Sequence, residues 1–290
     1  MKYEFIHTNR SVFGIENMCR VLCMSRSGYY AWIERPESNR DRENRMLVLK
    51  INKSHALSRD IYGSPRITDD LLDWGYKVSR PRVARLMQAN GIRSKIKRKF
   101  KVTTNSDHKL PISPNLLNQN FYASAPGLIL ISDITYIRTG EGWLYLTTIM
   151  DLFHRKIVGW SMSRTMTVQE TTIAALRQYL SNYKPAAGAI FHSDRGIQYA
   201  GKAFRELLNK YEMVQSMSGK GNCYDNAVAE SFFKTLKTEW VYHQRYRTRA
   251  QARNSIFEYI EVFYNKIRKH SALGYLSPDQ YYQQSIKWAA

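Results

Sequence analysis

The sequence predicts an α/β core, built as a mixed five-stranded sheet with helices, that is preceded by small all-α helix-turn-helix units. Beyond residue 121, three apolar runs of strand length follow one another, and further strands then alternate with helical patterns. Ahead of residue 100, apolar residues recur at helical spacing and the patterns end at Gly or Pro. Between these regions the chain is basic and then rich in Asn, Ser and Pro, which is typical of a linker.

We divide the chain into five segments on these patterns. They are an N-terminal helical unit with a helix-turn-helix pattern (1–60), a second helix-turn-helix-like unit (61–100), a basic and polar linker (101–120), the α/β core (121–240) and a basic C-terminal helical extension (241–290).

The first unit reads as helix, turn, helix. Met18, Val21 and Leu22 form one apolar face, and Ser25 is placed to cap a second helix. Pairs of short helices also occur in small bundles, so this pattern leaves DNA binding and simple packing open. Residues 37–46 are highly charged, and we expect them to continue as a helix.

The second unit has two short helices, of which the second is basic. Ser79 is placed to cap this helix, and Arg80, Arg82 and Arg85 are expected on its exposed face. Such a pair is typical of a reader of the DNA major groove, although the arginines could also simply face solvent. We take Arg66, in the first helix, as a further DNA-binding candidate.

A dense run of cations follows, with six Lys or Arg in the nine residues 93–101. Such a run repels itself unless it lies on an acidic partner such as DNA phosphates. We therefore expect it to contact the DNA backbone. The candidates are Lys95, Lys97, Arg98 and Lys99.

The core is expected in the order strand, strand, strand, helix, strand, helix, strand, helix. The expected bounds are 128–137, 143–150, 156–163, 168–180, 189–191, 200–210 and 214–218, with a last helix that reaches Trp240.

Three carboxylates occupy unusual places in this core. Asp133 lies inside an apolar strand, where an unpaired charge costs several kcal/mol unless something compensates it. Asp194 follows the end of another strand, and 35 residues separate it from Glu230. Glu230 falls on the polar face of the last helix, opposite an apolar stripe. Each alone could be a turn cap or a solvated side chain, but together they form a hard-oxygen site suited to one or two Mg²⁺ ions.

The blocks that carry these residues resemble a known family. They read ISDITYI, FHSDRGIQY and SMSGKGNCYDNAVAESFFKTLKTE, and the tail reads YNKIRKHSALGYLSPDQYY. They look like the blocks of DDE transposases and retroviral integrases. More narrowly, they resemble the second reading frame of insertion sequences of the "IS-three" family, over roughly residues 18–282.

The resemblance implies an RNase H-like catalytic core that cuts DNA and transfers strands. It places the catalytic and metal-binding roles on Asp133, Asp194 and Glu230, with two Mg²⁺ ions for which Mn²⁺ can substitute. It also implies double-stranded DNA partners (element ends and target), a homo-oligomer on DNA, and an upstream reading-frame product or a fusion with it. The expected location is the bacterial cytoplasm, at the nucleoid.

Composition agrees with a nucleic-acid partner. The formal charge is +20, from 44 Lys and Arg against 24 Asp and Glu. No apolar run approaches 18 residues and no signal peptide opens the chain, so we expect no membrane segment. Cys19, Cys23 and Cys223 have no framework or zinc spacing.

Four residues near the triad are auxiliary candidates. Lys234 and Lys237 lie on the polar face of the Glu230 helix and are expected to contact DNA. His192 is placed either to contact the scissile phosphate or a water at the metals, or only to hold the end of its strand. Asn226 lies on the same face as Glu230.

Two further expectations concern structure rather than chemistry. Asp225 is placed to cap the Glu230 helix, at a cost of roughly 1 kcal/mol when removed. A helix over residues 248–268 is expected to bury an apolar stripe of Ile256, Ile260, Phe263 and Ile267. The basic residues at its end are expected either to touch DNA or to face solvent, and they are Lys266, Arg268, Lys269 and His270.

Two other functions remain open on the sequence. One is a DNA-binding regulator that occupies element ends without cutting them. The other is an RNase H-like nuclease that acts on RNA–DNA hybrids or Holliday junctions. A strand-joining assay separates the three functions, since a regulator does nothing, a nuclease only cuts, and a transposase joins.

Overall fold

The central sheet has the five strands and the mixed directions that the sequence predicts. The computed structural model describes residues 2–96, 111–219 and 223–289. Strands β1 to β3 run antiparallel, while β4 pairs in parallel with β1 and with β5. The order is β3-β2-β1-β4-β5, so β1 is central. The bounds are β1 Ile129–Thr139, β2 Gly142–Asp151, β3 Ile157–Ser163, β4 Ile190–Ser193 and β5 Val214–Met217.

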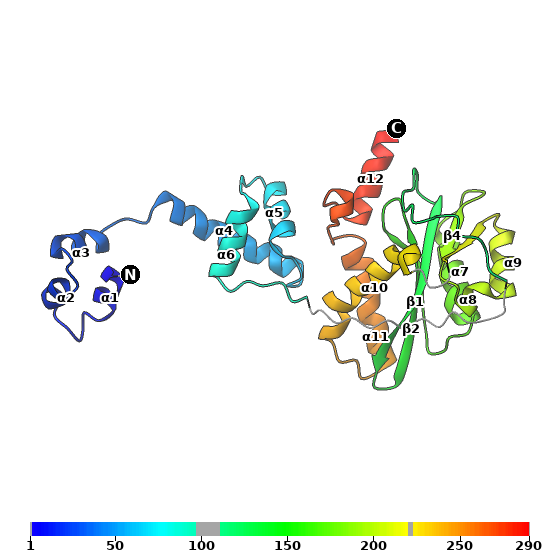
Figure 1. Cartoon of the computed structure of the whole chain (residues 1–290), viewed down its shortest axis with the longest axis horizontal. Helices are drawn as coiled ribbons and strands as arrows, with labels where there is room; N and C mark the ends of the chain where they lie inside the picture. The colour runs from blue at the N-terminus through cyan, green and yellow to red at the C-terminus, as the bar shows by residue number, and fades with distance from the viewer. Residues whose placement is uncertain (1, 97–110, 220–222, 290) are drawn as a thin grey trace.

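Helices cover both faces of this sheet, and neighbouring residues of β1 alternate between them (Figure 1). Leu130 packs into the cluster under α7, α8 and α9, whereas Ile131 packs into the cluster under α10 and α11. A π-helical turn, Gln169–Ile173, leads into α7, and Gly201 separates α8 from α9. The bounds are α7 Ala174–Asn182, α8 Ile197–Ala200, α9 Lys202–Lys210, α10 Ala227–Glu239 and α11 Arg249–Phe257.

The first three helices form a small cluster of their own, far from the sheet in Figure 1. They are α1 (Lys2–Thr8), α2 (Ile15–Val21) and α3 (Arg26–Ile33). The sequence pattern missed α1, and Val21 is exposed rather than part of the apolar face. The expected cap is present, because the Ser25 side chain accepts a hydrogen bond from the Gly28 amide at 3.1 Å.

Three further helices make the second helical unit. They are α4 (Asn39–Leu57), α5 (Ser64–Asp73) and α6 (Arg80–Ala89), and α4 packs on both of the others. Residues 39–57, which we assigned to the first unit, therefore pack within the second. Ser79 occupies the N-cap of α6, but its side chain makes no capping hydrogen bond.

The second unit is attached to the C-terminal extension by buried charge. The ammonium of Lys269 contacts Asp69, Asp70 and Asp73, all from α5, and its side chain is only 8% exposed. Arg268 is buried too and makes two hydrogen bonds to Glu239 at the end of α10, of 2.7 and 2.8 Å. The idea that Arg268 and Lys269 touch DNA or solvent is therefore wrong.

The extension continues as a π-helical segment (Glu258–Tyr264), a 3-10 turn (Ser271–Leu273) and α12 (Pro278–Ala289). Ile267, which we expected to be buried, is 43% exposed because the helix ends before it. None of the helices in the described part of the chain is long and apolar enough to cross a membrane.

Lys269→Met is expected to lower the free energy of unfolding by about 3 kcal/mol, because it leaves three neighbouring carboxylates without their buried cation. Urea denaturation of the full chain measures this. Lys266→Met is the matched control, since Lys266 is exposed and forms no ion pair with any described residue. Equal stability of the two variants would contradict the attachment by Lys269.

Candidate active site

Two of the three carboxylates meet at one edge of two adjacent parallel strands. The register pairs Ile131 of β1 with His192 of β4. Two residues further along each strand, that alignment brings Asp133 beside Asp194. Asp133 Oδ1 accepts a hydrogen bond from the Ile134 amide at 2.7 Å, and Asp194 Oδ1 accepts one from the Gly196 amide at 2.9 Å. Backbone amides thus orient both carboxylates.

Glu230 reaches the same edge from α10, which packs against β1. The apolar stripe of α10 is directed into the core, with Phe232, Leu236 and Trp240 buried. Glu230 is exposed in the first turn, on the face that the sequence pattern indicated.

The three carboxylates are close enough to affect one another's protonation. Burial raises the pKa of Asp133 well above its usual value, and the charges of Asp194 and Glu230 raise it further. Burial and Asp194 likewise raise the pKa of Glu230. Lys237 lies nearby and acts in the opposite direction on Asp133. Three mutually repelling carboxylates with one cation beside them are a donor set that fits divalent cations.

The described residues contain no group of three or more His, Cys, Asp or Glu side chains arranged to hold a metal ion. The three carboxylates lie close enough to raise one another's pKa, but in the described structure their side chains are not arranged as a set of metal ligands.

Tyr199 is a residue near the site that the sequence analysis missed. Its hydroxyl lies 2.8 Å from Ser132 Oγ, and its ring is buried. Burial raises the pKa of Tyr199 well above its usual value, and the charges of Asp133 and Asp194 add to that effect. This neutral phenol contacts β1 at Ser132, the residue before Asp133. The only signal in the sequence was an aromatic residue five positions after Asp194.

The surroundings of His192 match the structural one of the two roles expected for it. Its ring has no exposed surface, and Nδ1 lies 2.8 Å from Ser216 Oγ, with Nε2 3.3 Å from Ser218 Oγ. Burial lowers the pKa of His192 to about 4, so the ring is neutral at pH 7. It connects β4 to β5 through these two serines.

Asp225 does not cap the Glu230 helix, contrary to our expectation. It is buried and accepts hydrogen bonds from Asn115 Nδ2 (2.9 Å), Gln119 Nε2 (3.2 Å) and the Gly219 amide (2.7 Å). Asp225 therefore joins the segment before the core to the start of α10. Asn226 holds the N-cap position, without a side-chain cap bond, and its buried Oδ1 has no hydrogen-bond partner in the described structure.

The arginines of the helix-turn-helix unit differ in their surroundings. Arg80 and Arg85 are exposed on α6. Arg82 is held by α4, with Nη2 3.0 Å from Glu43 and 2.8 Å from Asn44. Arg66 is half-buried and donates from Nε to the Lys269 carbonyl at 2.9 Å.

The lysine candidates are also distinct from one another. Lys95 is half-buried, with its ammonium 5.4 Å from the centre of the Trp240 ring. Lys234 is exposed, and the ammonium of Lys237 lies 5.2 Å from the centre of the Tyr136 ring. Lys97, Arg98 and Lys99 lie outside the described residues.

Known proteins resemble the chain along nearly all of its length. Residues 123–223 and 230–286 match integrase core domain families, and residues 41–100 match an HTH-like domain family. A 31 kDa protein of insertion element IS600 from Shigella sonnei is 45% identical over 94% of this chain and 100% of its own. The transposase InsF of insertion sequence IS3A from Escherichia coli is 41% identical over 99% of this chain and 100% of its own.

Solved structures give weaker matches. The intasome of simian T-cell lymphotropic virus aligns with 80% of this chain and 74% of its own, at 15% identity and a TM-score of 0.46. The HTLV-2 integrase catalytic core domain, in complex with magnesium, aligns with 55–56% of this chain and 98–99% of its own. Its trimeric form gives 16% identity and a TM-score of 0.43, and its dimeric form gives 17% and 0.41.

Asp225→Ala is expected to cost about 3 kcal/mol of stability, well above the loss of a helix cap, because three donors lose the buried, charged acceptor that they share. Chemical denaturation measures the difference. Asp41→Ala is the matched control, since Asp41 is exposed in the first turn of α4. A loss at Asp225 no larger than that at Asp41 would show that the carboxylate is only a cap.

Proposed function

Because the chain belongs to the "IS-three" family of insertion-sequence transposases, we propose that it cuts DNA at the ends of an insertion sequence and joins them to another site through Asp133, Asp194 and Glu230. The observation that supports this assignment is the convergence of these three carboxylates from β1, from the end of β4 and from α10. The non-catalytic alternative has no specific support, because a DNA-binding regulator does not need a strand-end carboxylate cluster.

The three carboxylates are the residues that would hold two divalent cations, with Mg²⁺ as the expected ion and Mn²⁺ as a substitute. When bound, such a pair supplies an activated oxygen nucleophile and stabilises the leaving oxygen of a phosphodiester. The backbone amides of Ile134 and Gly196 orient the two aspartates for this role. Glu230 completes the set from a different element.

The proposed reaction has two steps. Water forms a new bond to phosphorus at the element end, and the bond from phosphorus to the 3′ oxygen breaks, which leaves a 3′-hydroxyl. That hydroxyl then attacks a second phosphodiester and displaces its 3′ oxygen. Lys237, which lies near Asp133, would bind a phosphate oxygen during either step. We propose that one element end first attacks the other to give a circular intermediate.

Recognition of the element ends falls to the helix-turn-helix unit in this proposal. Arg80 and Arg85 are exposed on α6 and free to enter a major groove, while Arg82 is held by Glu43 and Asn44 and is better suited to fixing α6 on α4. Lys95 and Lys234 would contact the backbone. A homo-oligomer on DNA and an upstream reading-frame product are further proposed partners.

Asp133→Asn, Asp194→Asn and Glu230→Gln are each expected to reduce Mg²⁺-dependent cleavage and joining by about 10³-fold or more, with DNA binding retained. Gel assays of labelled element ends measure both steps, and chelation of the metal should stop the wild type equally. Glu206→Gln, an exposed carboxylate on α9, is the control. Joining by any folded triad variant at the wild-type rate would refute the assignment.

Arg85→Ala is expected to cost about 1–3 kcal/mol of binding and to relax specificity at one base pair if Arg85 reads a guanine edge. Titrations of element-end and random duplexes at several salt concentrations test this. Arg82→Ala serves as the comparison and should instead lower stability. Equal loss of affinity for both duplexes in Arg85→Ala would mean that α6 grips only the backbone.

A further inference from the structure

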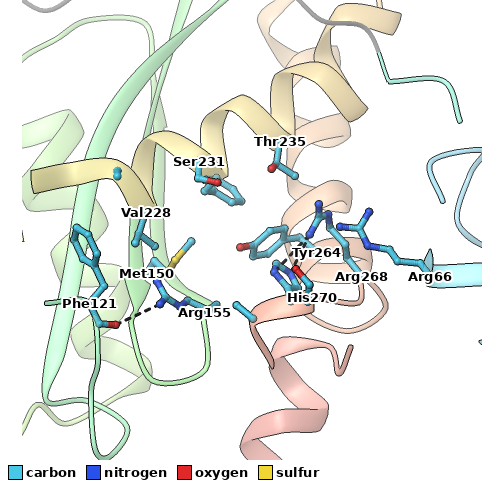
Figure 2. A pocket seen from close by; sticks show the side chains of 14 residues that line it. Arg66, Phe121, Met150, Arg155, Val228, Ser231, Thr235, Tyr264, Arg268 and His270 are labelled. Atoms are coloured by element: carbon cyan, nitrogen blue, oxygen red, sulfur yellow. Dashed lines mark hydrogen bonds between the residues drawn. The ribbon is translucent and has the colours of Figure 1, made fainter. Parts of the chain in front are cut away.

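A cavity lined by three arginines lies on α10, on a face next to the one that carries Glu230. Its volume is about 440 Å³, within the range of small-ligand sites. It opens between α10, the turn after β2 and the C-terminal extension (Figure 2). The triad residues do not line it, and no step of the proposed reaction uses it.

Three arginines converge on this cavity from separate segments. Arg66 comes from α5, Arg155 from the turn after β2 and Arg268 from the C-terminal extension (Figure 2). They surround His270, and burial together with these three charges lowers the pKa of His270 to about 2. The imidazole is therefore neutral, so it adds a hydrogen-bonding group without a fourth charge.

The arginines have too few acidic partners. Arg268 is satisfied by Glu239, and Arg66 Nη1 lies 3.8 Å from the same carboxylate. Arg155 donates from Nη2 to the Phe121 carbonyl at 3.3 Å and has no ion pair in the described part of the chain. Three guanidinium groups thus share one carboxylate, and Arg155 in particular keeps donors that can serve an anion.

The rest of the lining suits a phosphate that carries a nucleoside. The side chains of Ser231 and Thr235 line the cavity along α10, and their hydroxyls form no hydrogen bond with any described residue (Figure 2). Phe121, Met150 and Val228 give an apolar wall at the end where Arg155 lies. A sugar or base could pack there while the arginines bind the phosphate oxygens.

The position of the cavity connects it to the DNA path. Ser231 follows Glu230 directly, and Thr235 follows Lys234, so the cavity and the catalytic face are neighbouring faces of one helix. A helix with its side chains is about 10–12 Å across, a span of roughly three nucleotides at about 3.4 Å of rise each. One strand crossing α10 can therefore reach both faces.

We propose that this cavity binds a backbone phosphate of the DNA strand that crosses α10, with Arg155 and Arg66 donating to its oxygens. The proposal rests on the proposed function, because it takes DNA as the substrate. It assigns to Arg155 a role in holding the strand within a few nucleotides of the reacting phosphate.

The first test measures binding of a random-sequence duplex by fluorescence anisotropy at several salt concentrations. Arg155→Gln is expected to weaken binding about tenfold and to reduce the salt slope by about 0.9, as for one lost phosphate contact. Arg155→Lys should restore part of the slope. Arg177→Gln, an exposed arginine on α7 across the sheet, is the matched control and should leave both quantities near wild type.

The second test adds charge instead of removing it, which keeps the proposal testable if Arg155→Gln does not fold. Ser231→Glu puts a carboxylate into the cavity and leaves all three arginines, and it should weaken binding more than the uncharged Ser231→Gln. Thermal melts confirm folding of each variant. Equal binding by Arg155→Gln and Arg177→Gln, or by the two Ser231 variants, would overturn the proposal.

A third measurement distinguishes binding of DNA in the cavity from binding of a small anion. The two proteins are compared for duplex binding and for the effect of inorganic phosphate on their melting temperatures. If phosphate stabilises the wild type but not Arg155→Gln, while both bind the duplex equally, the DNA assignment is also overturned. Strand joining by the wild type is measured in parallel. Failure of the wild type to join DNA contradicts the proposed function, whereas normal joining with unaffected Arg155→Gln binding contradicts only the cavity.

Discussion

The parallel pairing of β1 with β4 is the constraint on which the candidate active site depends. β1 is the central strand, hydrogen-bonded to β2 on one side and β4 on the other. β4 runs parallel to β1 and ends at Ser193, so that register brings Asp194 beside Asp133 although 60 residues lie between them. Two like charges at that edge raise each other's energy, which a divalent cation or a proton must offset.

Helix α10 serves three surfaces at once. Its apolar stripe packs on the sheet, Glu230 and Lys237 face the carboxylate edge, and Ser231 with Thr235 face the arginine cavity. Glu239 at its end is buried and paired with Arg268. Any shift of α10 would therefore change the third carboxylate and the cavity together, and buried side chains such as Asp225 and His192 hold the segments that lead into it.

Charge inside the protein, rather than on its surface, attaches the helix-turn-helix unit to the core. Lys269 enters a group of aspartates on α5, and the hydroxyl of Tyr62 donates to the Ile267 carbonyl at 3.1 Å. Buried ion pairs are costly to break by removing one partner, so they fix an orientation even where they add little net stability. The unit that would read DNA is thereby held against the same extension that contributes Arg268 and His270 to the cavity.

The sequence by itself determined the succession of strands and helices along the core, the apolar stripe of α10 and the family, because periodicity and the motif blocks are local properties of the chain. It also placed Asp133, Asp194 and Glu230 in settings that point to one shared site, which remains a proposal for their catalytic role. It could not determine what individual Lys and Arg side chains contact. Arg82, Arg268 and Lys269 resemble any exposed basic residue in a linear pattern, yet the structure pairs each of them with a partner from another segment.

The same limit applies to Asp225, His192 and Tyr199. Their hydrogen-bond partners lie on other elements of the fold, so the spacing of residues along the chain does not predict these contacts. Burial depends on which elements pack together, and that decides whether a polar side chain binds DNA, fills a cavity or supports a neighbour. Only the tertiary structure brought Arg66, Arg155 and Arg268 into one cavity, because they are far apart in the sequence and share no motif.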